Sequence, residues 1–117
     1  MSIRALFAAT VFAALVGCAN DPAPIEQLRL TEQAVDQAKA VGATEEIPEL
    51  TLAQSKLIQA RADMANQSFK EARMQAEQSE LDARLAEARV LTQKSQEQIM
   101  QLNTRLNRLR KQVGDVQ

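Results

Sequence analysis

Apolar residues recur every three or four positions along most of this 117-residue chain, which is the spacing of one face of a helix. Residues 49–113 contain neither Gly nor Pro, so nothing in this stretch interrupts a helix. Glycine commonly follows the last residue of a helix, so Gly42 favours a helix end just before it. Proline is favoured in the first turn of a helix, so Pro48 favours a helix start. The sequence therefore predicts an all-α fold. Its three expected helices cover about residues 25–41, 49–65 and 69–112.

The boundary between the second and third helices has two interpretations. Ser68 and Glu71 have the spacing of a capping box, and Asn66 tolerates the left-handed backbone that ends a helix. Both features favour a turn at 66–68. However, the apolar stripe of the second helix continues in register through Ile99 as far as Val113, which would make one rod. Long polar residues interrupt that stripe near the capping signal, so we expect a helical hairpin or three-helix unit with a long C-terminal helix.

The third helix carries two apolar stripes. The first is made mostly of small residues, which would let a neighbouring helix approach closely. It consists of Phe69, Ala72, Ala76, Ser79, Ala83, Ala86 and Val90, with Leu81, Leu85 and Ala88 expected to widen it. The second stripe has the spacing of a coiled-coil seam. Its members Ile99, Leu102, Leu106, Leu109 and Val113 are the candidate partner-binding residues.

The two ends of the chain differ in charge, although the net charge is only −1. Residues 26–50 hold six acidic and two basic side chains, whereas four cations surround the second stripe. These cations are Arg105, Arg108, Arg110 and Lys111. They are interpreted either as ordinary solvated residues or as groups that steer head-to-tail association or partner docking. The near-neutral balance does not suggest a protein that binds nucleic acid.

Residues 1–17 have the layout of a signal peptide, with one positive charge at Arg4 before a mostly apolar run. That run covers about 18 Å as a helix, too little for a membrane core of about 30 Å. The segment LVGC ending at Cys18 resembles the lipobox of bacterial lipoproteins. This resemblance implies that Cys18 becomes a diacylated N-terminus, usually acylated again on its amine. Two such chains anchor a small protein stably. The alternatives are a conventional signal peptide or an inert cysteine.

The residue after Cys18 is Ala19 and not Asp. In enterobacterial lipoproteins an aspartate at this place acts as an inner-membrane retention signal, so the resemblance implies the periplasmic face of the outer membrane. Residues 18–24 are then a lipidated N-terminus and polar tether. Residues 25–117 are the expected periplasmic helical domain.

The composition excludes much catalytic chemistry. With no His and a single Cys, the chain cannot form a Ser-His-Asp triad, an imidazole metal site or a cysteine-rich zinc site. Glu45 and Glu46 are adjacent, but they fall in an expected loop where water keeps both ionised. We therefore expect no catalytic residue, no metal and no cofactor, and a protein that is not an enzyme.

Three segments carry a further resemblance. They are AKAVGA at residues 38–43, PELTLA at 48–53 and FKEA at 69–72, together with Leu57, Ala60 and Ala76. They are similar to an uncharacterised family of small, alanine-rich helical envelope lipoproteins of Gram-negative bacteria, known as a domain of unknown function. Some relatives are fused to, or encoded near, OmpA-like peptidoglycan-binding domains. The resemblance implies envelope organisation as the setting and an OmpA-like protein as a candidate partner.

These patterns predict a lipid-anchored periplasmic scaffold whose long helix pairs with itself, as a homo-oligomer, or with an envelope partner. The alternative is a wall tether like the major murein lipoprotein, which is also small and helical. That protein ends in a lysine joined to peptidoglycan, whereas this chain ends VGDVQ. Covalent attachment is therefore disfavoured, and non-covalent peptidoglycan binding stays open.

Overall fold

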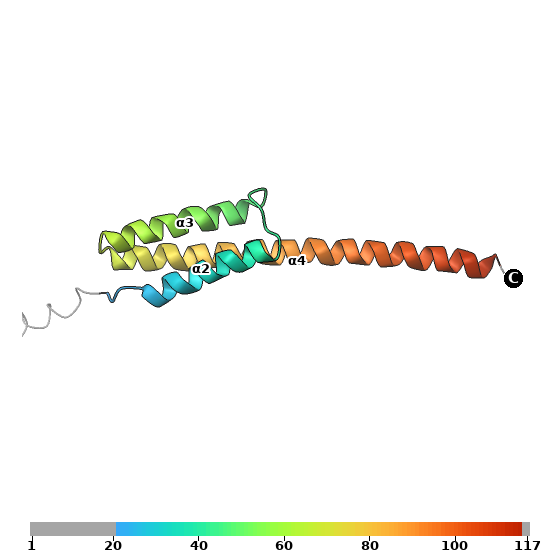
Figure 1. Cartoon of the computed structure of the whole chain (residues 1–117), viewed down its shortest axis with the longest axis horizontal. Coiled ribbons are helices and arrows are strands. Elements are labelled where there is room, and N and C mark those ends of the chain that lie inside the picture. Colours follow the sequence, from blue (N-terminus) through green and yellow to red (C-terminus); the bar gives the residue numbers. More distant parts are fainter. Residues whose placement is uncertain (1–20, 116–117) are drawn as a thin grey trace, which may run out of the picture.

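The computed structural model describes residues 21–115 as three helices joined by short turns. They are α2 (Ile25–Ala40), α3 (Pro48–Ala65) and α4 (Phe69–Gly114). Both α2 and α3 pack against the first half of α4, and the second half of α4 projects beyond them (Figure 1). The expected all-α fold with a long C-terminal helix is confirmed, and the single rod is excluded. The leader at 1–17 and Cys18 lie outside the described residues.

Helix α2 ends in a Schellman turn. The amide of Gly42 donates to the carbonyl of Lys39 and the amide of Ala43 donates to that of Ala38, both at 2.9 Å. This pair of bonds satisfies carbonyls that the helix end leaves free, and it requires one residue with a left-handed backbone. Gly42 has a φ of 104°, as expected for a glycine placed just after a helix. The chain can therefore turn toward Pro48, which occupies the first turn of α3.

Helix α3 ends in the same motif but without a glycine. The amide of Gln67 donates to the carbonyl of Met64 at 3.1 Å, and that of Ser68 donates to Asp63 at 2.9 Å. The left-handed position falls on Gln67, whose φ is 61°. The expectation that Asn66 would take this conformation is wrong, because α3 extends to Ala65 and Asn66 has a φ of −82°.

The expected capping box at the start of α4 is also absent. Ser68 precedes the helix, but its side chain makes no capping hydrogen bond. The reason lies in the backbone, since Ser68 has a ψ of 66° and a capping residue usually has an extended backbone. The turn at 66–68 thus depends on the Schellman bonds after α3, and Glu71 contributes only a favourable charge in the first turn of α4.

Replacing Gln67 by glycine is expected to stabilise the fold by about 0.5–1 kcal/mol. A side chain in the left-handed region costs about 1–2 kcal/mol, and removing it outweighs the extra freedom that glycine gives the unfolded chain. Urea unfolding followed by circular dichroism measures the change. Asn66→Gly is the control and should destabilise, because Asn66 is right-handed. A lower unfolding midpoint for Gln67→Gly would contradict the role given to this turn.

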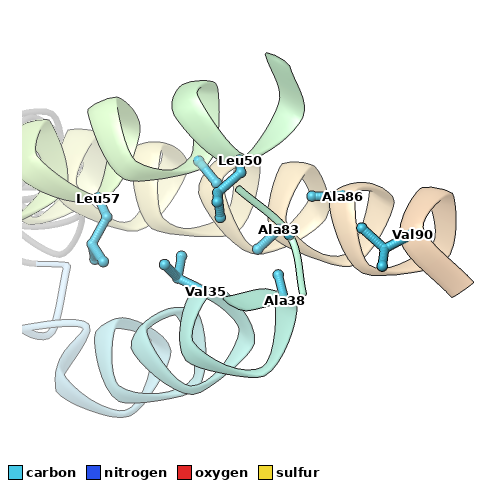
Figure 2. Packing of buried hydrophobic residues seen from close by; sticks show 9 residues of the cluster. Val35, Ala38, Leu50, Leu57, Ala83, Ala86 and Val90 are labelled. Carbon is cyan, nitrogen blue, oxygen red and sulfur yellow. The ribbon is translucent and has the colours of Figure 1, made fainter. Parts of the chain in front are cut away.

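The core lies where α2 and α3 meet α4, and alanine dominates it. Figure 2 shows Leu50 and Leu57 extending from α3 toward α2, with Val35 meeting them and Ala83 beneath Leu50. The cluster comprises Val35, Ala38, Ala43, Leu50, Ala53, Leu57, Ala83, Ala86 and Val90. Because alanine is small, the helix backbones can approach closely, and the core has a few large side chains set among many small ones.

Two buried hydroxyl groups join the backbones of neighbouring helices. The Thr31 hydroxyl shares its proton between the carbonyls of Gln27, at 2.8 Å, and Ala76 of α4, at 3.0 Å. The Ser79 hydroxyl of α4 donates to the carbonyl of Ala53 in α3 at 2.6 Å. Such short side chains reach a carbonyl of another helix only where the helices are close. Thr31 and Ser79 therefore fix the contacts of α4 with α2 and α3 respectively.

Candidate interaction surface of helix α4

Helix α4 has an inner seam, which faces the other two helices. Its six residues are spaced alternately by four and three, and all are buried. They are Ala72, Ala76, Ser79, Ala83, Ala86 and Val90. This is the small-residue stripe expected from the sequence, except that Phe69 at its start is only partly buried. The inner seam is therefore the face of α4 that packs against α2 and α3.

The opposite face of α4 carries an outer ridge. It consists of Leu81, Leu85, Ala88, Thr92, Ser95, Ile99, Leu102, Leu106, Leu109 and Val113. Ser79 and Leu81 illustrate the relation of the two faces, because a step of two residues turns about 200° around a helix. The expectation that Leu81, Leu85 and Ala88 widen the inner face is therefore wrong, and all three are exposed. The outer ridge covers 33 residues, about 50 Å of helix.

The five candidate partner-binding residues all lie on the projecting half of α4. Every residue from 91 to 115 is exposed, and the five candidates have exposed fractions of 50% to 66%. The structure brings Ile99, Leu102, Leu106, Leu109 and Val113 onto one side of one helix. Their role in binding a partner stays a prediction.

Ion pairs at the edge of the inner seam join α3 to α4. Lys56 Nζ lies 2.7 Å from Asp82 Oδ2, and Arg89 Nη2 lies 2.9 Å from Glu49 Oε1. Sequence reasoning missed both pairs, because their partners are far apart in the chain. The signal that would have found them is the antiparallel alignment of the two helices once a turn at 66–68 is accepted.

Glu80 joins α4 to α2. Its carboxylate accepts hydrogen bonds from Arg84, at 2.6 Å, and from Gln27 of α2, at 2.8 Å. The Arg84 bonds, then the Gln27 bond, hold the pKa of Glu80 below its ordinary value of 4.5. A lowered carboxyl pKa contributes stability above the unfolded-state pKa, and that contribution is lost as pH falls through the folded pKa.

Lys94 marks the point where the bundle ends and the projecting half of α4 begins. Its Nζ donates to the carbonyl of Val41 at 2.5 Å, next to the C-terminus of α2. A cation is favourable there because the end of a helix carries partial negative charge. A side chain added at Gly42 would lie 3.4 Å from Lys94 Nζ, so glycine also leaves room for this contact.

A groove of about 360 Å³ lies between α2 and α3. It is lined by the apolar Leu57 and Ile58 and by the Arg61–Glu32 ion pair, whose nitrogen and oxygen atoms are 2.8 Å apart. Residues 21–115 contain no group of His, Cys, Asp and Glu arranged to hold a metal ion. In the same part of the chain, no helix has the length and apolar character needed to cross a membrane.

Residues 26–102 match the family described as a domain of unknown function, DUF4398. The chain belongs to this family. A crystal structure of a DUF4398 protein from Pseudomonas aeruginosa PAO1 is similar, with 59% identity and a TM-score of 0.80 over 82% of this chain and 100% of that chain. No curated protein matches the sequence. The resemblance read from residues 38–43, 48–53 and 69–72 is thus confirmed as far as an uncharacterised helical family.

The DUF4398 match begins at Glu26, in the first turn of α2, and stops at Leu102, within the outer ridge. It therefore contains the inner seam and the turns after α2 and α3. The basic end of α4, where Leu106, Leu109 and Val113 lie, follows the matched region. The family description names no activity. A functional proposal therefore depends on the exposed outer ridge of α4.

Proposed function

We propose that this DUF4398 protein is a lipid-anchored, non-catalytic scaffold at the periplasmic face of the outer membrane, and that the outer ridge of α4 is its binding surface. The observation that carries the proposal is the ridge itself. Apolar side chains exposed by half or more continue along a straight helix beyond the bundle that they do not help to build. Contiguous exposed apolar surface of this kind is typical of interaction sites.

The position of the N-terminal segment supports an anchored arrangement. Arg73, near the start of α4, donates to the carbonyl of Pro22 at 3.3 Å. The chain therefore enters the bundle at the end remote from the projecting half of α4 (Figure 1). Acylation of Cys18 would then attach each copy to the membrane at the end of the bundle where α4 begins, and the outer ridge, which runs along the side of α4, would stay uncovered by the lipid.

The lipid anchor is tested by mass spectrometry of the full chain extracted from bacterial envelopes. The expected mature protein begins at Cys18 and carries two or three acyl chains, palmitate among them. The Cys18→Ser variant is the control and should keep its leader or leave the membrane fraction. An unmodified Cys18 thiol, or an uncleaved leader in the parent protein, would refute the anchor and the assigned compartment together.

The binding surface is tested by chemical crosslinking in intact envelopes. Leu102→Lys with Leu106→Lys puts two charges on the outer ridge, and the crosslinked products of the parent protein should disappear. Gln101→Lys with Asn107→Lys adds the same charge off the ridge and should leave them in place. If both double variants behave alike, the ridge is not the binding surface.

A second candidate is a non-covalent peptidoglycan tether. It is favoured by the basic end of α4, where residues 98–114 hold four cations and no acidic residue, since the peptide stems of the wall carry carboxylates. Sedimentation with purified sacculi tests it, and binding that fails in low salt would exclude it.

A further inference from the structure

We infer that the outer ridge binds the outer ridge of a second copy of this chain, with the two α4 helices antiparallel and related by a twofold axis near Glu97. This inference rests on the proposed function, because it names the partner of the same surface. All residue pairs described for this dimer are contacts between the two copies.

The ridge follows a heptad pattern in which Ile99 and Leu106 occupy a positions, and Leu102 and Leu109 occupy d positions. The positions that flank such a seam face the partner helix and select it. In a parallel, in-register pair, Arg105 of one copy faces Arg110 of the other. Within the bundle section of α4, Arg84 likewise faces Arg89, but these arginines already pair with Glu80 and Glu49 of their own chain. The repulsion in the parallel pair therefore comes mainly from Arg105 and Arg110.

The parallel pair also packs poorly. Large residues occupy the ridge from Ile99 onward, whereas Ala88, Thr92 and Ser95 form a section of small residues just before it. In register, small residues would face small ones and leave space between the helices. Unfilled space loses van der Waals contacts and weakens the pair.

The antiparallel pair resolves both problems. With the axis near residue 97, Ile99 lies opposite Ser95, Leu102 opposite Thr92 and Leu106 opposite Ala88. The section of large residues in each copy therefore packs against the section of small residues in the other. Alternation of large and small side chains across an interface is how helices fill the space between them.

The outer layers and flanks fit the same alignment. Leu109 lies opposite Leu85, and Val113 lies opposite Leu81 at the edge of the bundle. In an antiparallel pair the e positions face each other, so Arg110 of one copy approaches Asp82 of the other. Asp82 is partly exposed beside Lys56, with 20% of its side chain accessible. Each Arg110 therefore meets the carboxylate of a Lys56–Asp82 ion pair, and not the arginine that it faces in the parallel pair.

Antiparallel alignments shifted by one heptad make less favourable contacts. A shift in one direction puts Leu109 opposite the polar Gln78, and a shift in the other puts Arg110 beside Arg89. Only the axis near residue 97 uses the whole ridge from 81 to 113 without either defect. This length is nearly five heptads, more than the three or four that indicate a coiled coil.

Disulfide crosslinking of the full chain in membranes tests the orientation and the alignment together. The Ala88→Cys, Leu106→Cys double variant should form a covalent dimer under mild oxidation, because residues 88 and 106 of opposite copies meet. These two positions are about 27 Å apart within one helix, so the bond cannot form inside one chain. Both sites are exposed, so the variants should fold.

Three controls run alongside this variant. Leu106→Cys alone should form no covalent dimer in the antiparallel pair, because the two cysteines lie far apart, but would crosslink to itself in a parallel pair. Ala88→Cys with Ile99→Cys reports the alignment shifted by one heptad and should not crosslink. The parent chain under the same oxidant shows any crosslinking by Cys18.

A covalent dimer from the 88 and 106 double variant, and none from the controls, supports the inference. Dimers from Leu106→Cys alone, or from the 88 and 99 double variant, overturn it. It is also overturned if no variant dimerises while the lysine variants of Leu102 and Leu106 still lose crosslinks to another protein. That last result would leave the proposed function standing, whereas loss of acylation at Cys18 would affect only the anchor.

Discussion

Replacing Leu50 by alanine is expected to destabilise the bundle by about 2–5 kcal/mol, because it opens a cavity where α3 meets α2 and α4. Leu50 is 1% exposed and is the largest side chain that the described residues bury completely. Its neighbours in the core are mostly alanines, which cannot extend to fill the space. Since small domains are stable by only about 5–15 kcal/mol, this single change removes a large part of the total.

Leu52→Ala provides the matched control for Leu50→Ala. Leu52 lies two residues away in the same helix but is 50% exposed. Its replacement should change the free energy of unfolding by much less. Guanidinium unfolding followed by circular dichroism compares the two variants. Equal losses for Leu50→Ala and Leu52→Ala would show that α3 is not oriented as described.

A larger side chain in the inner seam is expected to destabilise the bundle by a comparable amount. Here the cause is overpacking and not a cavity. Ala83 is fully buried between α4 and the other helices, so leucine at this position must push α2 or α3 away. Overpacking of a well-packed site costs about 1–3 kcal/mol and sometimes more. We expect about 3 kcal/mol for Ala83→Leu, because separating the helices also lengthens the hydrogen bond from Ser79 to Ala53.

Ala62→Leu is the control for Ala83→Leu. Ala62 is exposed on α3, and alanine and leucine have similar helix propensities, so the change there should be close to neutral. The difference between the two midpoints of thermal unfolding then measures packing alone. A tolerated leucine at Ala83 would mean that the three helices do not meet closely at the inner seam.

Local residue chemistry was enough to predict the elements of this fold but not the way in which they pair. Gly42 and Pro48 delimit α2 and α3, and the spacing of alanines from Ala72 onward identifies the inner seam. The left-handed residue at Gln67 could not be predicted, since glutamine has no preference for that conformation. The bonds of the Schellman turn impose it once α3 extends to Ala65.

The alternative of one continuous rod arose from a real feature of the sequence. The stripe of α3 continues in register into α4, but there it becomes the outer ridge and not the inner seam. The turn at 66–68 reverses the chain and rotates α4 so that Ala83, and not Leu81 or Leu85, faces α3. Residue spacing within a helix cannot specify this rotation. It depends on which of two faces allows the closer approach, and the face lined with alanine does so.

The candidate site was likewise predictable from the sequence only in part. Ile99, Leu102 and Leu106 could be recognised from their spacing, because an apolar repeat among polar residues is visible in a single helix. The partners of Lys56 and Lys94 could not be recognised, since each ion pair or hydrogen bond requires the relative height of two helices. The sequence also cannot tell an exposed apolar repeat from one that the same chain covers, and the structure removes that ambiguity.

Because α4 belongs to both the bundle and the projecting segment, the molecule behaves mechanically as a lever. The helix contains 46 residues, about 69 Å, with no glycine or proline before its last residue to act as a joint. Tilting the base by ten degrees would sweep the far tip through about 12 Å. The contacts that hold the bundle therefore determine the direction in which the projecting half of α4 points. A small rotation of the bundle becomes a large displacement of the C-terminal end of α4.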